Sequence, residues 1–392
     1  MASGAPPRDE RVVTTPDADG HGRLGELARL FGRLGVVAFG GPAAHIAMMH
    51  DEVVTRRRWL SDAAFVDLIG VTNLIPGPNS TEMTMHVGWV RAGWRGLIVA
   101  GASFILPAAA IVLACAVAYV RYGQTPNGQA LLHGVKPVVL VIIAQALVKL
   151  GRTALAAGRL QWVVGAAAIV AYLLGGNEIV ILALGALVVL AWRTLGPATG
   201  PTSVVAVLLA TEQAGALGLG RILAVFLKIG AVLYGSGYVL LAFLRSDLVV
   251  RLDVLTNQQL LDAVAIGQFT PGPLFTTATF IGYVLAGLPG AVVATIGIFL
   301  PSFCFVAAIG PHVEQLRRRT WTAALLDGVN AAAVGLMAGV MIELAGDALV
   351  DPLTVVLALA TAVLLWRTSL NSAWLVLGGA VIGMAASAAG LI

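Results

Sequence analysis

Long apolar segments separated by short polar loops make up most of this chain. A helix needs about 20 apolar residues to cross a bilayer, because each residue adds about 1.5 Å along the helix axis. The pattern predicts an all-α polytopic membrane protein of about ten transmembrane helices, with one broken or re-entrant helical hairpin in each half. The apolar segments of the first half are 27–49, 96–120, 131–150, 161–174 and 179–191.

Each half contains a Pro-Gly-Pro triplet inside an apolar stretch, first at Pro76-Gly77-Pro78 and then at Pro271-Gly272-Pro273. Proline removes a backbone donor and clashes with the preceding helical turn, while glycine permits unusual dihedrals. Each triplet should therefore end one helix and begin another. The arms around the first triplet, within 63–89, are too short to span a bilayer. A re-entrant hairpin is the favoured reading, and two full crossings are the alternative.

These breaks have a functional meaning inside a membrane. Backbone groups left unpaired in a bilayer are tolerated only where protein or a watery cavity surrounds them. A helix N-terminus that points into such a cavity attracts anions. Interrupted segments at matching positions of two halves are the best sequence indication of a transporter's binding site. The two triplets therefore predict an anion site shared by the two halves.

The second half repeats the first. Phe31–Gly35 matches Phe226–Gly230 at an offset of 195 residues, and the same offset pairs Asp67 with Asp262 and the two triplets with each other. One deleted residue later the offset becomes 194, and the register then holds almost to the end of the chain. This is a tandem duplication. The predicted parts are a disordered tail 1–22, a first membrane repeat 23–193, a linker 194–220 and a second membrane repeat 221–392.

Composition and charge support this reading. Of the 392 residues, 58% are hydrophobic and only 11% are charged, whereas globular domains carry about 25% charged residues. The basic residues behind the net charge of +4 lie mostly in short loops, which indicates membrane orientation rather than nucleic-acid binding. With five crossings in each copy, these charges predict an inverted repeat with both termini outside. If the first segment is itself re-entrant, each copy has fewer than five crossings and the two repeats are no longer inverted.

Neither a cofactor nor a metal site is expected. Cys115 and Cys304 both lie in apolar segments, where a free cysteine behaves as a small hydrophobe. The chain shows no nucleotide-binding glycine loop and no cysteine spacing typical of haem or iron–sulfur proteins. These absences argue against a membrane enzyme and against pumping driven by ATP.

Four short motifs stand out, namely Phe39–His45, Asn73–Glu82, Arg91–Gly93 and Gln268–Pro273. Together they resemble the chromate ion transporter (CHR) family, in its long form with two copies. The resemblance implies a multi-pass protein of the bacterial inner membrane that exports chromate and is driven by the proton-motive force. The implied partners are chromate or a sulfate-like oxyanion and membrane lipid, with a homodimer left open. Sulfate or molybdate transport and an anion channel are the alternatives.

A tetrahedral dianion needs positive potential and hydrogen-bond donors. Arg33 and Lys228 are matched by the repeat, and Lys136 also lies in an apolar run, where a charge usually faces the protein interior or a water-filled path. The predicted substrate-binding residues are Arg33, Asn73, Gly77, Asn79, Ser80, Thr81, Lys136, Lys228, Gln268, Gly272, Thr276 and Thr277. The predicted structural breaks are Gly40, Gly41, Pro42, Pro76, Pro78, Pro271 and Pro273. The alternative readings are ordinary helix caps and cations that reach toward the membrane surface.

Proton coupling is expected at a carboxylate and an imidazole near the first triplet. Glu82 and His86 are four residues apart and therefore share one helical face. His45 follows the Gly40-Gly41-Pro42 break. A change of protonation beside an anion site alters the local charge, which is what coupling requires. The alternative is a structural polar pair inside the bundle.

Overall fold

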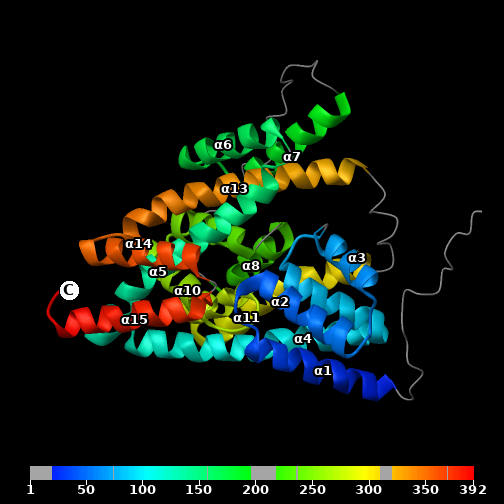
Figure 1. The fold of residues 1–392 in the computed structure, drawn as a ribbon, viewed down its shortest axis with the longest axis horizontal. Helices are drawn as coiled ribbons and strands as arrows, with labels where there is room; N and C mark the ends of the chain where they lie inside the picture. The colour runs from blue at the N-terminus through cyan, green and yellow to red at the C-terminus, as the bar shows by residue number, and fades with distance from the viewer. Residues whose placement is uncertain are drawn as a thin grey trace, which may run out of the picture.

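The computed structural model describes residues 20–73, 75–156, 158–195, 218–234, 237–309, 320–368 and 370–392. Every regular element in these ranges is helical (Figure 1), which confirms the predicted all-α class. The tail 1–22 and the linker 194–220 fall almost entirely outside the described residues.

The first copy begins with two short arms that run back along each other. Helix α1 (Gly20–Val37) is followed by α2 (Gly41–His50) and the π-helical η1 (Asp51–Arg56). The His45 ring donates to the carbonyl of Ala38 at 3.0 Å, and the Arg33 guanidinium lies 3.7 Å from the Glu52 carboxylate. The arms are therefore antiparallel. The expectation that 27–49 forms one crossing was wrong, because the break at Gly40 (φ 106°) and Gly41 (φ 79°) reverses the chain.

A second hairpin follows, with the first Pro-Gly-Pro triplet at its tip. Helix α3 (Asp62–Thr72) leads to the triplet, and α4 (Asn79–Tyr122) leads away from it. Helix α4 itself folds back at Ala92–Gly93, where the dihedrals are not helical. Gly88 and Gly96 meet so closely across this turn that a Cβ on either would collide with the other's backbone. The arm 79–91 thus returns from the tip, and the long arm 94–122 then crosses the molecule (Figure 1).

The second copy builds the same elements. Helix α8 (Leu219–Val232), the 3-10 turn η2 (Gly237–Val239), α9 (Leu240–Leu244) and the π-helical η3 (Arg245–Arg251) form its first hairpin. Helix α10 (Asn257–Phe269), η4 (Leu274–Thr276) and α11 (Thr277–Ile309) form the second. Helix α11 folds back at Ala286–Gly287 with dihedrals within about 3° of those at Ala92–Gly93. Arg58 (φ 52°) and Asp253 (φ 49°) occupy matching left-handed turns. The duplication read from the sequence is therefore a duplication of structure.

The remaining helices exchange between the copies. In the first copy these are α5 (Pro126–Ala154), α6 (Arg159–Leu173) and α7 (Glu178–Leu195), and in the second α13 (Thr320–Ala348), α14 (Pro352–Arg367) and α15 (Ser372–Ala388). Helix α5 packs against α14 and α15, while α13 packs against α6 and α7. Small residues allow these close approaches: Gly134 touches the backbone of Gly379, and Gly185 touches that of Gly328. The copies are interlocked rather than placed side by side.

The two copies enter the molecule from opposite ends. Trp59, just before α3, lies under the guanidinium of Arg91, whose Cζ is 5.0 Å from the ring centroid. Arg91 directly precedes the turn that leads into the long arm of α4. Helix α10 instead lies beside the other end of that arm, where the Tyr119 hydroxyl donates to Asp262 at 3.0 Å. We call the end that carries Arg56, Arg57 and Arg91 the arginine end.

The arginine end also holds the beginning of α1, the end of α7 and the beginning of α13, whereas the chain finishes at the opposite end (Figure 1). Glu26 of α1 pairs with Arg91 at 3.2 Å. The prediction that both termini lie opposite the arginine-rich loops is therefore wrong for the first helix. The physical reason is that α1 and α2 form a hairpin, so the first copy starts and re-emerges at one end.

Four described helices are long and apolar enough to cross a membrane, namely Asn79–Tyr122, Pro126–Ala154, Leu274–Ile309 and Ala323–Ala348. Three shorter apolar helices, Arg159–Leu173, Pro352–Arg367 and Ser372–Ala388, accompany them. Large apolar side chains cover their outer surfaces, including Trp162, Trp366 and Trp374, which are more than half exposed. Such an apolar surface is typical of a protein that faces lipid.

Candidate functional site

The two Pro-Gly-Pro turns are buried, and each is bonded to the other copy. The amide of Gly77 donates to the carbonyl of Leu233 at 2.7 Å, and the amide of Gly272 donates to the carbonyl of Ala38 at 2.9 Å. Leu233 and Ala38 are matching positions, each just past the end of its copy's first helix. The predicted breaks at Pro76, Pro78, Pro271 and Pro273 are therefore present, and they lie in the protein interior. Both glycine amides are occupied, so neither is available to an anion in this conformation.

Buried polar side chains lie at the first turn and in the helix that follows it. The Glu82 carboxylate and the Ser302 hydroxyl lie side by side against Gly77, while Thr81 Oγ1 and His86 Nε2 of α4 lack a hydrogen bond to any described residue. Glu82 and Ser302 both lie against Gly77, where a Cβ would collide with each of them. Leaving a buried polar group unpaired costs about 1–3 kcal/mol. A cluster of such groups points to a ligand or a proton that the site binds.

The start of α4 adds free backbone donors to this cluster. Pro78 is the N-cap residue and gives no side-chain cap, so the amides of Asn79 and Ser80 have no intrahelical acceptor. The positive end of the helix dipole favours negative charge at this position. Across the break, the Asn79 side chain donates to Asn73 at 2.8 Å. Asn73 and Asn79 thus hold the two arms together at the rim of the site.

The second turn differs, because its hydroxyls are satisfied within the turn. Thr276 donates to the carbonyl of Pro273 and Thr277 to that of Leu274, both at 2.8 Å. Gln268 alone keeps a buried amide nitrogen without a partner among the described residues. The two turns are alike in backbone and unlike in side-chain chemistry.

The three expected cations lie away from the turns and are paired. Arg33 lies near Glu52 at 3.7 Å, Lys228 near Asp247 at 2.5 Å, and Lys136 near Asp262 at 3.4 Å. The repeat relates the first two pairs, since Glu52 and Asp247 are also 195 residues apart. These charges therefore fasten hairpins in the structure shown.

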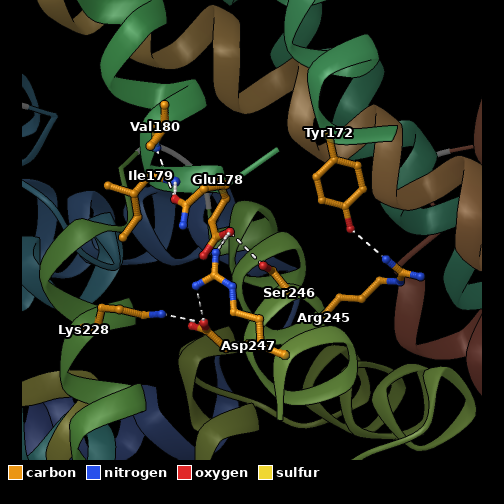
Figure 2. Close-up of polar contacts among 10 residues, drawn as sticks. Tyr172, Glu178, Ile179, Val180, Lys228, Arg245, Ser246 and Asp247 are labelled. Carbon is orange, nitrogen blue, oxygen red and sulfur yellow. Dashed lines mark hydrogen bonds and ion pairs between the residues drawn. The ribbon is translucent and has the colours of Figure 1, made fainter. Parts of the chain in front are cut away.

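The second-copy hairpin is also tied to the first copy by a polar network (Figure 2). Glu178 of α7 is fully buried and accepts from Ser246 at 2.7 Å and from Arg251 at 2.9 Å. Arg251 also reaches Asp247 at 3.2 Å. Nearby, Arg245 donates to the Tyr172 hydroxyl at 3.0 Å. Sequence reasoning gave Glu178 and Asp247 no site role, although the acidic match of Asp247 with Glu52 could have indicated a paired structural charge.

The Gly40-Gly41-Pro42 break turns α1 into α2, as expected of a break. His45 is buried against the edge of Phe104, with ring centroids 5.7 Å apart, and its Nδ1 has no partner among the described residues. It belongs to the first hairpin rather than to the cluster at Gly77.

The described residues contain no group of three or more His, Cys, Asp or Glu that could hold a metal ion. A cavity of about 10 Å³ lies between the copies, lined by residues that include Ile143, Leu241 and Val264. It has room for about one water molecule and its walls are apolar. The polar cluster at Gly77 is therefore the better candidate site.

Two interlocked copies, each with a helix broken deep inside an apolar bundle, define a membrane transport protein. The chain matches the chromate transporter family twice, over residues 25–191 and 220–384. It belongs to that family.

Three relatives agree with this assignment. The chromate transport protein of Cupriavidus metallidurans is 34% identical over 93% of each chain. The probable chromate transport protein of Synechococcus elongatus is 32% identical over 88% of this chain and 90% of its own. The chromate transport protein of Pseudomonas aeruginosa is 32% identical over 91% of each chain. No solved structure matches the chain.

Proposed function

We propose that this protein is a secondary active transporter that exports chromate across the bacterial inner membrane and couples the export to a proton at Glu82. The single observation that carries the proposal is the fully buried carboxylate of Glu82, which lies beside the Ser302 hydroxyl at the broken helix where the two copies meet. Membership of the chromate transporter family and the names of its relatives supply the substrate class.

Electrostatics couples the two ligands. A dianion that binds at the amides of Asn79 and Ser80 would meet a second negative charge if Glu82 were ionised. Like charges at close range in a poorly solvated site are strongly unfavourable. The anion therefore binds while Glu82 carries a proton, and the proton leaves after the anion.

The membrane potential supplies the direction. One elementary charge moved across 100 mV is worth about 2.3 kcal/mol. The cell interior is negative, so the potential drives a dianion outward even when one proton travels with it. We propose that the long axis of Figure 1 is the membrane normal and that the arginine end faces the cytoplasm, because basic residues are retained there.

The test is chromate uptake by everted membrane vesicles under an imposed potential, measured over a range of external pH. Wild-type uptake should fall as pH rises, because Glu82 ionises and repels the anion. Glu82→Gln keeps the neutral form, so uptake should persist and lose that pH dependence. His86 shares a helical face with Glu82, and Tyr234 follows the residue bonded to Gly77, so His86→Gln and Tyr234→Phe are measured in parallel.

Asp62→Asn is the matched control. It removes an exposed carboxylate at the start of α3 and should leave the pH profile unchanged. Uptake by Glu82→Gln with the wild-type profile would reject Glu82 as the coupling residue. Flux that follows the potential alone in the wild type would indicate an anion channel. Stronger uptake of sulfate or molybdate than of chromate would change the substrate.

A further inference from the structure

The duplication allows the two Pro-Gly-Pro turns to be compared position by position, and they are not equivalent. At the first turn, Glu82 neighbours Ser302 of the second copy, and Tyr234 of the second copy directly follows Leu233, which is bonded to Gly77. The repeat places Thr277, Ala108 and Phe39 at the corresponding positions of the second turn. Every polar member of the first set is thus replaced by an apolar side chain or by a threonine bonded within its own turn.

Ser302 shows this difference most clearly. It is fully buried in α11, and its hydroxyl interacts with the Glu82 carboxylate. The hydroxyl lies against Gly77, at the same point as the Glu82 carboxylate. At the second turn a Cβ on Gly272 would meet the methyl group of Ala108 instead. The methyl group of Ala108 is enough to pack against Gly272. Packing alone therefore does not explain why Ser302 carries a hydroxyl at the corresponding position.

Tyr234 approaches the same place from the end of α8. It directly follows Leu233, whose carbonyl accepts from Gly77. The second copy therefore brings the Ser302 hydroxyl against the Glu82 carboxylate and places Tyr234 one residue from the backbone contact with Gly77. The second turn has no counterpart of either Ser302 or Tyr234 in chemical type.

We infer that the protein holds one oxyanion site rather than two, and that Ser302 and Tyr234 of the second copy complete the site begun by Thr81 and Glu82 of the first. This rests on the proposed function. A tetrahedral dianion offers four acceptor oxygens, and the hydroxyls of Thr81, Ser302 and Tyr234 donate to it together with the amides at the start of α4. The second turn, around Gly272, is a structural support.

Single-atom substitutions at matching positions test the inference. Ser302→Ala removes the hydroxyl from the first turn, and Ala108→Ser adds one at the second. A hydrogen bond to a charged group contributes enough that its loss weakens binding about 10-fold to 100-fold. Ser302→Ala should therefore raise the Kd for chromate and for sulfate by that factor, while Ala108→Ser should change it less than about twofold.

The measurement is ligand-induced thermal stabilisation of the full-length protein in lipid nanodiscs, titrated with sodium chromate and, separately, with sodium sulfate. Equal Kd values for Ser302→Ala and wild type, or equal losses in both variants, would overturn the single composite site and leave the transport proposal standing. A wild-type protein that binds neither dianion would overturn both. Melting temperatures without ligand show whether each variant is folded, and Ser302→Gly provides a second variant if Ser302→Ala is not.

Discussion

At the residue scale, Gly77 explains why the first turn must contain glycine. Its φ of 141° lies in a region that other residues rarely adopt. A Cβ would also strike the Glu82 carboxylate and the Ser302 hydroxyl. The backbone conformation and the lack of space therefore both require glycine at position 77, because the Glu82 and Ser302 side chains pack directly against its backbone.

Gly77→Ala should consequently damage both folding and transport. Strain of about 1–3 kcal/mol at a left-handed position corresponds to a Tm lower by about 1–4 °C in a protein of this size. Chromate transport should fall at least about tenfold, because the displaced groups are those of the site. Gly25→Ala is the control: this glycine is helical and has open space around it, so alanine should leave Tm unchanged or raise it. Wild-type Tm and transport in Gly77→Ala would contradict this account of the turn.

The sequence was sufficient to predict the turn but not its partners. Proline, glycine and the polar residues after them carry local signals, so Pro76, Pro78 and Glu82 could be singled out. Ser302 could not be singled out in this way, because it lies in an apolar helix of the other copy. Only the tertiary fold brings its hydroxyl next to Glu82. Arg33 and Lys228 looked exceptional in their apolar segments, yet their acidic neighbours Glu52 and Asp247 come from the returning arm of a hairpin that had not been expected.

At the element scale, the described chain folds back on itself in six places, three in each copy. Ion pairs fasten the first hairpin of each copy. The segment 27–49 has the apolar length of one crossing, which is why length alone misled. The glycines at its centre predict a break, and the His45–Ala38 hydrogen bond and the Arg33–Glu52 pair show that this break reverses the chain. Glu178 of α7, in the first copy, also binds Arg251 in the first hairpin of the second copy (Figure 2).

Glu178→Gln should destabilise the protein measurably. The variant removes a buried carboxylate and leaves Arg251 with a weaker partner, a loss of about 1–3 kcal/mol that should appear as a lower Tm. Asp327→Asn is matched to it, since the Arg193–Asp327 pair also ties α7 to the second copy but is about one-third exposed. Exposed pairs contribute about 0–1 kcal/mol, so the control should change Tm little. Equal shifts in the two variants would show that burial of the network does not matter.

At the scale of the whole molecule, the exchange of helices makes the two copies one body. Helix α5 packs on α14 and α15, and α13 packs on α6 and α7, so a boundary drawn along the sequence does not divide the structure. The repeat register predicted two equivalent copies. It could not predict the exchange, because contacts between distant helices leave no local periodicity. The charge pattern predicts an inverted repeat only if each copy has five crossings. In the structure, the hairpins of the two copies start from opposite ends of the molecule without that number of crossings.

We propose that the two hairpins with Pro-Gly-Pro tips enter the membrane from opposite faces, so that each tip reaches the other copy in the interior. Arg58 and Asp253 are exposed, lie in matching turns of the two copies and are suited to test it. Single cysteines, Arg58→Cys and Asp253→Cys, are placed in a chain whose Cys115 and Cys304 are replaced by alanine, and each is labelled in intact cells with a thiol reagent that does not cross the membrane. We predict that the cysteine at position 253 reacts in intact cells and that the one at position 58 reacts only in everted vesicles. Labelling of both positions from the same face would contradict the opposed hairpins and, with them, the site at their meeting point.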